Sequence, residues 1–425
     1  MREVLAKNVV LNVKPLTQFR TIKIQINFLR PINKDESTKR RLLANVLSNS
    51  TKKYPSFKAI NDREMELYGA EVNAYTRSLL NFNDLGFSVE FADPSFLIGD
   101  TDQVENNLDL LGDIIFEPNL ASDTEFDSTA FNVEKRNMMS NLQAVQDNQD
   151  LVSMLELSKL IHQDEPNKLI PIFGNEDQLR DLTNAQLLDY YHDAIANDFV
   201  LINVVGNVDP EKFANLVKDK FSARLLKQKR NDLSIKFEKF DKLIADPAHG
   251  QDKKEVNQSR LAIGYYVEKI DKEFSHLAPQ AMNLILGGDD QSQLFLQVRE
   301  KNSLAYSVSS SYSPNNHLLT ITAGLDAKTI KQAMDLIEVQ LDFMRSGKFT
   351  DEQIEHAKKV LFTRRQISSD NIQHYIMRSI WESVYPKAML SEEAYKAELD
   401  KLDRKHIIAV ANNLHLIADY KLIGE

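Results

Sequence analysis

The fold of this chain is indicated most clearly by one short pattern that occurs twice. The first copy is Arg63-Glu64-Met65-Glu66-Leu67-Tyr68-Gly69-Ala70-Glu71-Val72, and the second, 236 residues further on, is Arg299-Glu300-Lys301-Asn302-Ser303-Leu304-Ala305-Tyr306-Ser307-Val308. Both copies begin with an Arg-Glu pair and end in residues that favour a strand. A pattern that recurs far along the chain indicates an internal repeat.

Further matches extend the repeat in both directions. Residues 22–28 and 260–267 both have the composition and alternation of half-buried strands. Leu182-Thr183 matches Leu402-Asp403, and Val204-Val205-Gly206-Asn207 matches Leu422-Ile423-Gly424-Glu425. Each copy therefore predicts an early strand, a helix, a pair of strands (71–80 and 85–91; 307–312 and 318–323), several long helices and a last strand.

This order of elements predicts the α+β class, because strands grouped before helices favour a sheet with helices on one side. We expect two homologous domains, each a mixed or antiparallel sheet with helices packed on one face. Their predicted bounds are 1–221 and 258–425. The polar stretch 222–257, which contains Pro247 and Gly250, is predicted to be a linker.

Composition excludes several classes of function. The chain has 425 residues, 42% of them hydrophobic, and 52 Lys and Arg against 62 Asp and Glu give a net charge of −10, which disfavours nucleic acid as a partner. It has no cysteine, which suits a reducing compartment. The apolar runs are too short to span a bilayer, so we expect a soluble cytoplasmic protein with no membrane partner.

The second copy of the repeat carries a resemblance to a known family. Residues 294–308 resemble the Leu-Phe-x-x-Val-Arg-Glu-Lys-x-x-Leu-Ala-Tyr-Ser segment of the pitrilysin/insulinase metallopeptidases, the inverzincins. Residues 51–55, 204–210 and 258–261 add to the resemblance, which covers essentially the whole chain. It implies the two-domain bacterial form of the family, built from duplicated α+β domains.

The resemblance also indicates where a zinc site would lie. The family motif H-x-x-E-H supplies two zinc-binding histidines and a general base, and a later Glu completes the site. The family spacing to Thr51 places this motif on residues 41–45, where Arg41, Ala44 and Asn45 occupy the chemical positions. The later pattern falls on Glu134 and Asn141, so an amide replaces the zinc-binding carboxylate.

These replacements predict a chain without a catalytic zinc or any other cofactor. Arginine cannot lose its proton to bind a cation, alanine offers no base, and amide oxygens are weak zinc ligands. We expect helix geometry to place Arg41, Ala44 and Asn45 on the side opposite the apolar residues. Arg41 and Glu134 are either a pair that fills the former metal site or two solvated charges.

A second set of residues matches the family without replacement. Arg299 and Tyr306 resemble its substrate-binding Arg/Tyr pair, in which Arg donates to a peptide carbonyl and Tyr donates to the oxyanion. The alternative is local structure, with Arg299 paired to a neighbouring acid and Tyr306 packed on a strand. The first copy has Ala70 where Tyr306 would be, so duplication alone does not explain the tyrosine.

The resemblance and the replacements together predict a non-catalytic, peptide-binding subunit of a heterodimeric zinc endopeptidase. Its partner would be a homologous chain with an intact zinc motif, and a homodimer is also possible in this scheme. A second hypothesis is a binding or assembly protein on the same scaffold without chemistry. A third is an enzyme whose metal site has moved to scattered histidines such as His356 and His374.

Overall fold

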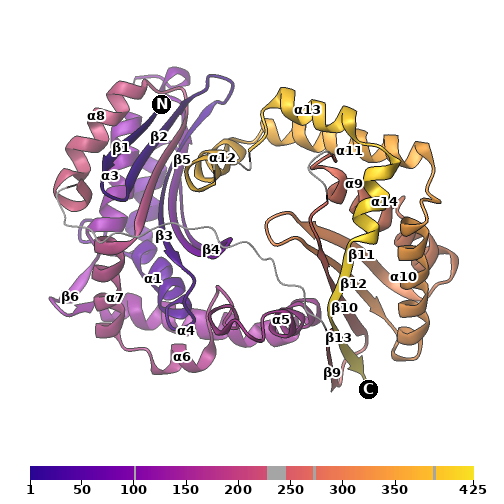
Figure 1. Ribbon diagram of the computed structural model, residues 1–425. Helices are drawn as coiled ribbons and strands as arrows, with labels where there is room; N and C mark the ends of the chain where they lie inside the picture. The colour runs from indigo at the N-terminus through magenta and orange to yellow at the C-terminus, as the bar shows by residue number, and fades with distance from the viewer. Residues whose placement is uncertain (100–101, 227–245, 271–273, 386–388) are drawn as a thin grey trace. The chain divides into compact units, whose positions relative to one another are not determined.

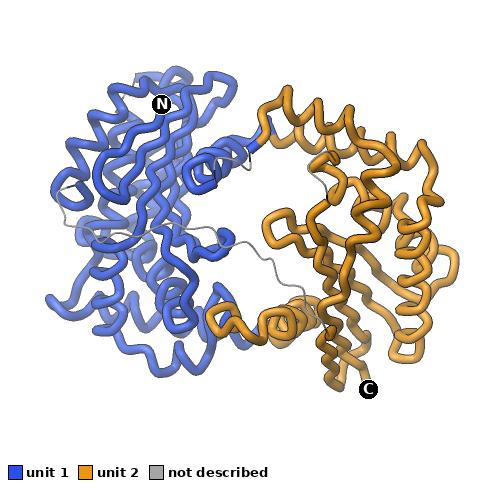
Figure 2. The backbone as a smooth tube through the Cα atoms, in the orientation of Figure 1, with its two compact units in different colours: residues 1–144, 170–237, 369–389 blue, residues 145–169, 238–368, 390–425 orange. Residues whose placement is uncertain are grey.

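Two mixed β-sheets organise the chain, which a computed structural model describes over residues 1–99, 102–226, 246–270, 274–385 and 389–425 (Figure 1). Each sheet belongs to one of two units (Figure 2). Unit 1 consists of residues 1–144, 170–237 and 369–389, and unit 2 consists of residues 145–169, 238–368 and 390–425. Each unit therefore combines segments from both halves of the chain.

Unit 1 is built on a six-stranded sheet with the order β1-β2-β8-β3-β5-β4. β2 and β8 pair in parallel, and the other neighbours are antiparallel. The strands are β1 (Arg2–Ala6), β2 (Val9–Pro15), β8 (Phe199–Gly206), β3 (Thr21–Pro31), β5 (Phe82–Ala92) and β4 (Glu71–Leu79). β8 is central and buried along nearly its whole length, which explains its almost continuous apolar sequence.

Unit 2 is built on a five-stranded sheet with the order β11-β12-β10-β13-β9. Its strands are β11 (Ala305–Ser313), β12 (Leu318–Leu325), β10 (Ser259–Val267), β13 (Leu414–Gly424) and β9 (Ala248–Lys254). From β9 to β11 the pairings are one parallel followed by three antiparallel, as they are from β2 to β4 in unit 1. This shared topology confirms the internal duplication.

Helices cover one face of each sheet. In unit 1, the residues Ile22, Ile24, Ile26 and Phe28 of β3 join a core with α1, α3, α7 and α8. The helices of unit 1 on this side and around it are α1 (Ser37–Asn49), α2 (Phe57–Glu66), α3 (Gln103–Phe116), α4 (Ser128–Ala144), α6 (Glu176–Asp181), α7 (Asn184–Asn197) and α8 (Pro210–Phe221). A small hairpin, β6 (Leu120–Ser122) and β7 (Glu125–Phe126), adjoins them.

The corresponding helices of unit 2 are α9 (Ala278–Gly287), α10 (Ile330–Arg345), α11 (Asp351–Ser369), α13 (Glu392–Lys401) and α14 (Arg404–Asn412). Short 3₁₀ turns are η1 (Pro94–Phe96), η2 (Val145–Asp147), η3 (Pro166–Lys168) and η6 (Ala327–Thr329), and π-helical segments are η4 (Ser222–Leu226) and η5 (Phe295–Lys301). Thr183 before α7 and Asp403 before α14 each form a capping box, so the matched dipeptides of the repeat begin equivalent helices.

One helix also lies against the opposite face of each sheet. α12 (Ile372–Val384) packs on the sheet of unit 1, and α5 (Gln149–Ile161) packs on the sheet of unit 2. The apolar side of α12 consists of Ile372, Ile376, Ile380 and Val384. Under α12, Gln25 and Asn27 are fully buried and hydrogen-bonded to each other at 3.0 Å. The side of β3 that carries polar residues therefore faces protein and not water.

The predicted α+β class with mixed sheets is confirmed, and the single helix on the second face adds to the predicted arrangement. The predicted linker 222–257 differs in detail, because residues 248–254 form the edge strand β9 and 222–226 form η4. Residues 227–245 lie outside the described residues. β9 was missed because its exposed charged side chains, typical of an edge strand, have the composition of a linker.

None of the helices within the described ranges has both the length and the apolar character needed to cross a lipid bilayer.

Candidate functional site

Helix α1 presents the residues of the expected zinc motif on one side. Arg41, Asn45 and Ser48 are spaced at i, i+4 and i+7 and are half-buried. The opposite, apolar side is packed into the core of unit 1 and consists of Leu42, Leu43, Val46 and Leu47. Ala44 was expected beside Arg41 but is 0% exposed, so this prediction was wrong. Its small side chain fits in the close contact between α1 and the core.

Arg40 holds α1 in place. Its side chain is 0% exposed and donates hydrogen bonds to the Tyr190 hydroxyl at 2.9 Å and to the Phe28 carbonyl. It also pairs with the fully buried Asp198 carboxylate. Burial is the largest single effect and lowers the pKa of Arg40, but the interactions with Asp198 and Tyr190 together outweigh it, so the pKa is raised. The guanidinium is therefore always charged and is neutralised inside the protein.

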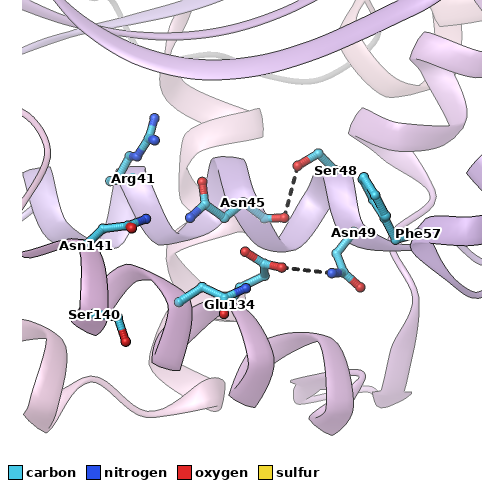
Figure 3. A pocket seen from close by; sticks show the side chains of 9 residues that line it. Arg41, Asn45, Ser48, Asn49, Phe57, Glu134, Ser140 and Asn141 are labelled. Atoms are coloured by element: carbon cyan, nitrogen blue, oxygen red, sulfur yellow. Dashed lines mark hydrogen bonds between the residues drawn. The ribbon is translucent and has the colours of Figure 1, made fainter. Parts of the chain in front are cut away.

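Helix α4 supplies the second wall of the site. Glu134, Asn137 and Asn141 recur at i, i+3 and i+7 on one side of this helix. A cavity of about 490 Å³ lies against the two walls (Figure 3). Its lining is mostly polar and consists of Arg41, Asn45, Ser48, Asn49, Phe57, Glu134, Asn137, Ser140 and Asn141. The structure thus brings together four of the five expected positions, all except Ala44.

The hydrogen bonds of the cavity do not include the hypothesised Arg41–Glu134 pair. Glu134 accepts a bond from the Asn49 amide at 2.9 Å. The Arg41 side chain points away from Glu134 (Figure 3). Among the described residues, no ion pair or hydrogen bond joins Arg41 to any side chain. The pairing hypothesis was therefore wrong. The Glu134 carboxylate is bonded to Asn49, which lies on α1 with Arg41.

The second expected site lies in unit 2, where η5 leads into β11. The Ser303 amide donates to the Arg299 carbonyl at 3.1 Å, and the Leu304 amide donates to the Val298 carbonyl at 3.0 Å. These bonds close a tight turn in which Ser303 has a φ of +50°. Tyr306 follows at a β-bulge, where β11 shifts its register against β12. Arg299 and Tyr306 therefore lie on adjoining elements at one end of an edge strand.

Both side chains are exposed and have local partners. The Arg299 guanidinium lies 4.7 Å from the centre of the Phe295 ring and 3.6 Å from the Glu300 carboxylate. Tyr306 is 61% exposed, and its hydroxyl donates to the Asp326 carboxylate at 3.2 Å. The pKa of Tyr306 is raised above its usual value, mainly by the negative charge of Asp326 and secondly by this hydrogen bond. Like an ordinary tyrosine, Tyr306 is protonated at neutral pH.

Comparisons with known proteins agree with this geometry. The family model described as "Peptidase M16 inactive domain" matches residues 181–361. A probable inactive metalloprotease of Bacillus subtilis, YmfF, is 28% identical over 408 residues, covering 96% of this chain and 94% of that protein. A conserved protein of Enterococcus faecalis has a crystal structure with a TM-score of 0.93 at 28% identity, covering 100% of this chain and 98% of that one. A peptidase M16 inactive domain of Pseudomonas fluorescens has the same fold, with a TM-score of 0.78 at 16% identity.

The chain thus matches the pitrilysin/insulinase (M16) metallopeptidases in sequence over residues 181–361 and in fold over its whole length, and the proteins it matches include some that are named as inactive. The family implies a zinc ion, and the residues of the cavity do not fit one. They offer a guanidinium, neutral amides and a single carboxylate whose Oε1 already accepts a bond from Asn49. Zinc in proteins takes histidine, cysteine or carboxylate ligands, typically four in total with water. No step of peptide hydrolysis therefore runs through a metal in this cavity.

The scattered histidines form no substitute metal site among the described residues. His356 pairs with Asp289 at 2.9 Å in unit 2, whereas His374 belongs to α12 of unit 1. Within the described ranges, no group of three or more His, Asp or Glu residues is arranged to hold a metal ion.

Sequence reasoning missed several residues that the structure places at these sites. Asn137 was detectable, because it continues the i, i+3 spacing from Glu134 on α4. Phe57 and Asp326 were not, because each reaches its site from another element and no local pattern connects them.

Proposed function

We propose that this chain is the non-catalytic, substrate-binding subunit of a heterodimeric zinc endopeptidase that acts on peptides. The supporting observation is a contrast between its two units. In unit 1 the metal ligands are replaced by Arg41, Asn45 and Asn141, whereas in unit 2 the Arg299 and Tyr306 side chains are kept and exposed. A homologous partner chain would supply the zinc and the general base, and this chain would supply the Arg/Tyr pair.

The two side chains have the chemistry that this role needs. The Arg299 guanidinium presents fixed N–H donors to a peptide carbonyl. The Tyr306 phenol, whose pKa Asp326 raises, is protonated at neutral pH like an ordinary tyrosine, and it donates a hydrogen bond to the oxyanion. Removal of one such donor typically lowers the rate by a factor of about 10² to 10³. We place this activity in the cytoplasm, which the lack of cysteine suits.

The proposal is tested by co-expressing the chain with zinc-bearing homologues and assaying cleavage of fluorogenic peptides. We expect more cleavage than with the partner alone, and a loss of roughly tenfold or more on Arg299→Ala or Tyr306→Phe. Lys301→Ala is the matched control, because it removes an exposed cation two residues from Arg299. Cleavage that does not rise with this chain, or that is unchanged in both variants, contradicts the proposal. The native mass of the mixture separates a heterodimer from a homodimer.

A second candidate function is a binding or assembly protein without chemistry. It is favoured by the local partners of the pair, since Tyr306 is already bonded to Asp326 and Arg299 already stacks on Phe295. An oxyanion donor must release Asp326, whereas a structural tyrosine needs it. In Asp326→Asn, partner-dependent cleavage should therefore persist if Tyr306 serves catalysis. A separate binding measurement tests the second candidate, which is supported by tight assembly with a chain that lacks the zinc motif.

A further inference from the structure

The cavity of unit 1 has lost the charge that a cation needs and has gained the donors that an anion needs. Arg41 is its one cationic side chain, and its guanidinium has no hydrogen-bond or ion-pair partner among the described residues. Glu134 is the single carboxylate of the cavity, and its Oε1 accepts a hydrogen bond from Asn49. In Figure 3, Asn49 lies at the right of the view and Arg41 at the left. An arginine with free N–H groups in a cavity can form a strong bidentate pair of hydrogen bonds with a carboxylate.

Three asparagine side chains line the same cavity as this arginine. The side chains of Asn45, Asn137 and Asn141 line the cavity, and none of them is hydrogen-bonded to another described residue. An amide both donates and accepts, so it can bind the carbonyl and the N–H of a peptide unit. At the rim, the Phe57 side chain is 58% exposed and offers an apolar contact. An inorganic anion would use Arg41 but would leave these other groups unoccupied.

We propose that this cavity binds a carboxylate carried by a peptide, with Arg41 as the counter-ion and the asparagines as partners of the adjoining peptide units. The volume of about 490 Å³ suits a carboxylate with one or two residues attached, because ligand pockets generally measure about 300–1,000 Å³. The carboxylate has two sources in a peptide, the C-terminus and an Asp or Glu side chain. The site is independent of the Arg/Tyr pair, which lies in unit 2.

The test measures binding of short fluorescent peptides to the full chain by anisotropy. Three peptides of otherwise equal, uncharged sequence are compared: a free C-terminal acid, its C-terminal amide, and an amide that contains one internal Glu. We expect the amide without Glu to bind roughly tenfold or more weakly than at least one of the carboxylate peptides. The better of the two carboxylate peptides identifies the source of the carboxylate.

Variants then locate the binding site. Arg41→Ala should weaken the carboxylate peptide by roughly tenfold or more and leave the amide unchanged. Arg136→Ala is the matched control, because Arg136 is an exposed arginine on α4 that does not line the cavity, and it should have no effect. Arg41→Lys keeps the positive charge but loses the bidentate donor geometry of the guanidinium, so it should give an intermediate affinity for the carboxylate peptide. Glu134→Gln removes the only negative charge of the cavity and should strengthen binding.

Three results would overturn the inference. The first is equal binding of the acid and the amide peptides. The second is an equal loss in Arg41→Ala and Arg136→Ala, which would indicate attraction by surface charge alone. The third is displacement of the peptide by inorganic phosphate at concentrations as low as those of the carboxylate peptide itself. Because these measurements use this chain alone, their failure is distinct from a failure of the cleavage assay with the zinc-bearing partner.

Discussion

The substitution Asp198→Asn tests how helix α1, and with it the cavity, is held in place. Asp198 is 0% exposed and lies directly after α7. One carboxylate oxygen pairs with Arg40, and the other pairs with the Arg30 Nε at 2.6 Å. Asparagine keeps the size and one acceptor but removes the charge. Arg30 retains Glu36 and Asp193, whereas Arg40 is left as a fully buried cation with neutral partners only.

The expected cost follows from that buried charge. Removal of one partner from a buried ion pair typically destabilises a protein by about 3–5 kcal/mol. For a unit of this size, each kcal/mol lowers the melting temperature by about 2–4 °C, so we expect a decrease of roughly 6–20 °C. Asp193→Asn is the matched control, because Asp193 pairs with Arg30 in the same cluster but its side chain is 47% exposed. Exposed pairs contribute at most about 1 kcal/mol.

The single tryptophan provides the assay. Trp381 lies on α12 and packs against the apolar cluster that α12 forms with the sheet of unit 1. Its fluorescence during thermal and urea unfolding therefore reports on unit 1. If Asp198→Asn and Asp193→Asn lower the stability of unit 1 by the same amount, the buried charge of Arg40 does not depend on Asp198 and the reasoning fails.

Three further predictions concern α12, the exposed tyrosine and the former metal site. Ile376→Ala should destabilise unit 1 by about 2–5 kcal/mol in the tryptophan assay, because Ile376 is 0% exposed against the sheet; a change below about 1 kcal/mol would mean that α12 is not docked there. The Tyr306–Asp326 bond stabilises the fold below pH 10 and is lost as the pH rises through the raised pKa of Tyr306, so Asp326→Asn should move the phenol ionisation, followed by tyrosine NMR, to lower pH. An unchanged titration would exclude Asp326 as the cause. The chain should bind no zinc at the cavity in metal analysis, whereas restored ligands should bind one equivalent, and absence of zinc from the restored variant would mean that the site is misplaced. The restored variant combines Arg41→His, Asn45→His and Asn141→Glu.

Much of the fold was predictable because its patterns are local. The alternating strands around residues 22–28 and 260–267, the following strand pairs and the capped helices after Thr183 and Asp403 are all read from neighbouring residues. The side of α1 that bears Arg41 and Asn45 was predictable for the same reason, since helix periodicity assigns each residue to a side. Ala44 was the exception, because its burial depends on how closely α1 approaches the core.

The exchange of helices between the halves of the chain was not predictable from local patterns. α5 lies within the first copy of the repeat but packs in unit 2, and α12 lies within the second copy but packs in unit 1. The sequence of an amphipathic helix shows that the helix has an apolar side, but it does not indicate which sheet that side will pack against. Likewise Gln25 and Asn27 alternate with apolar residues as if they faced water, yet α12 covers them and they bond to each other.

The amino-acid sequence alone determined the duplication, the α+β class and the loss of the zinc ligands, because each depends on residue identity and spacing along the chain. Only the tertiary structure decided that Asn49 bonds to the Glu134 carboxylate, that Arg41 has no partner among the residues the structure describes, and that Tyr306 bonds to Asp326. Hydrogen bonds and ion pairs form over a few ångströms in space between specific side-chain conformations, and residue order does not specify which of several nearby partners a polar group takes.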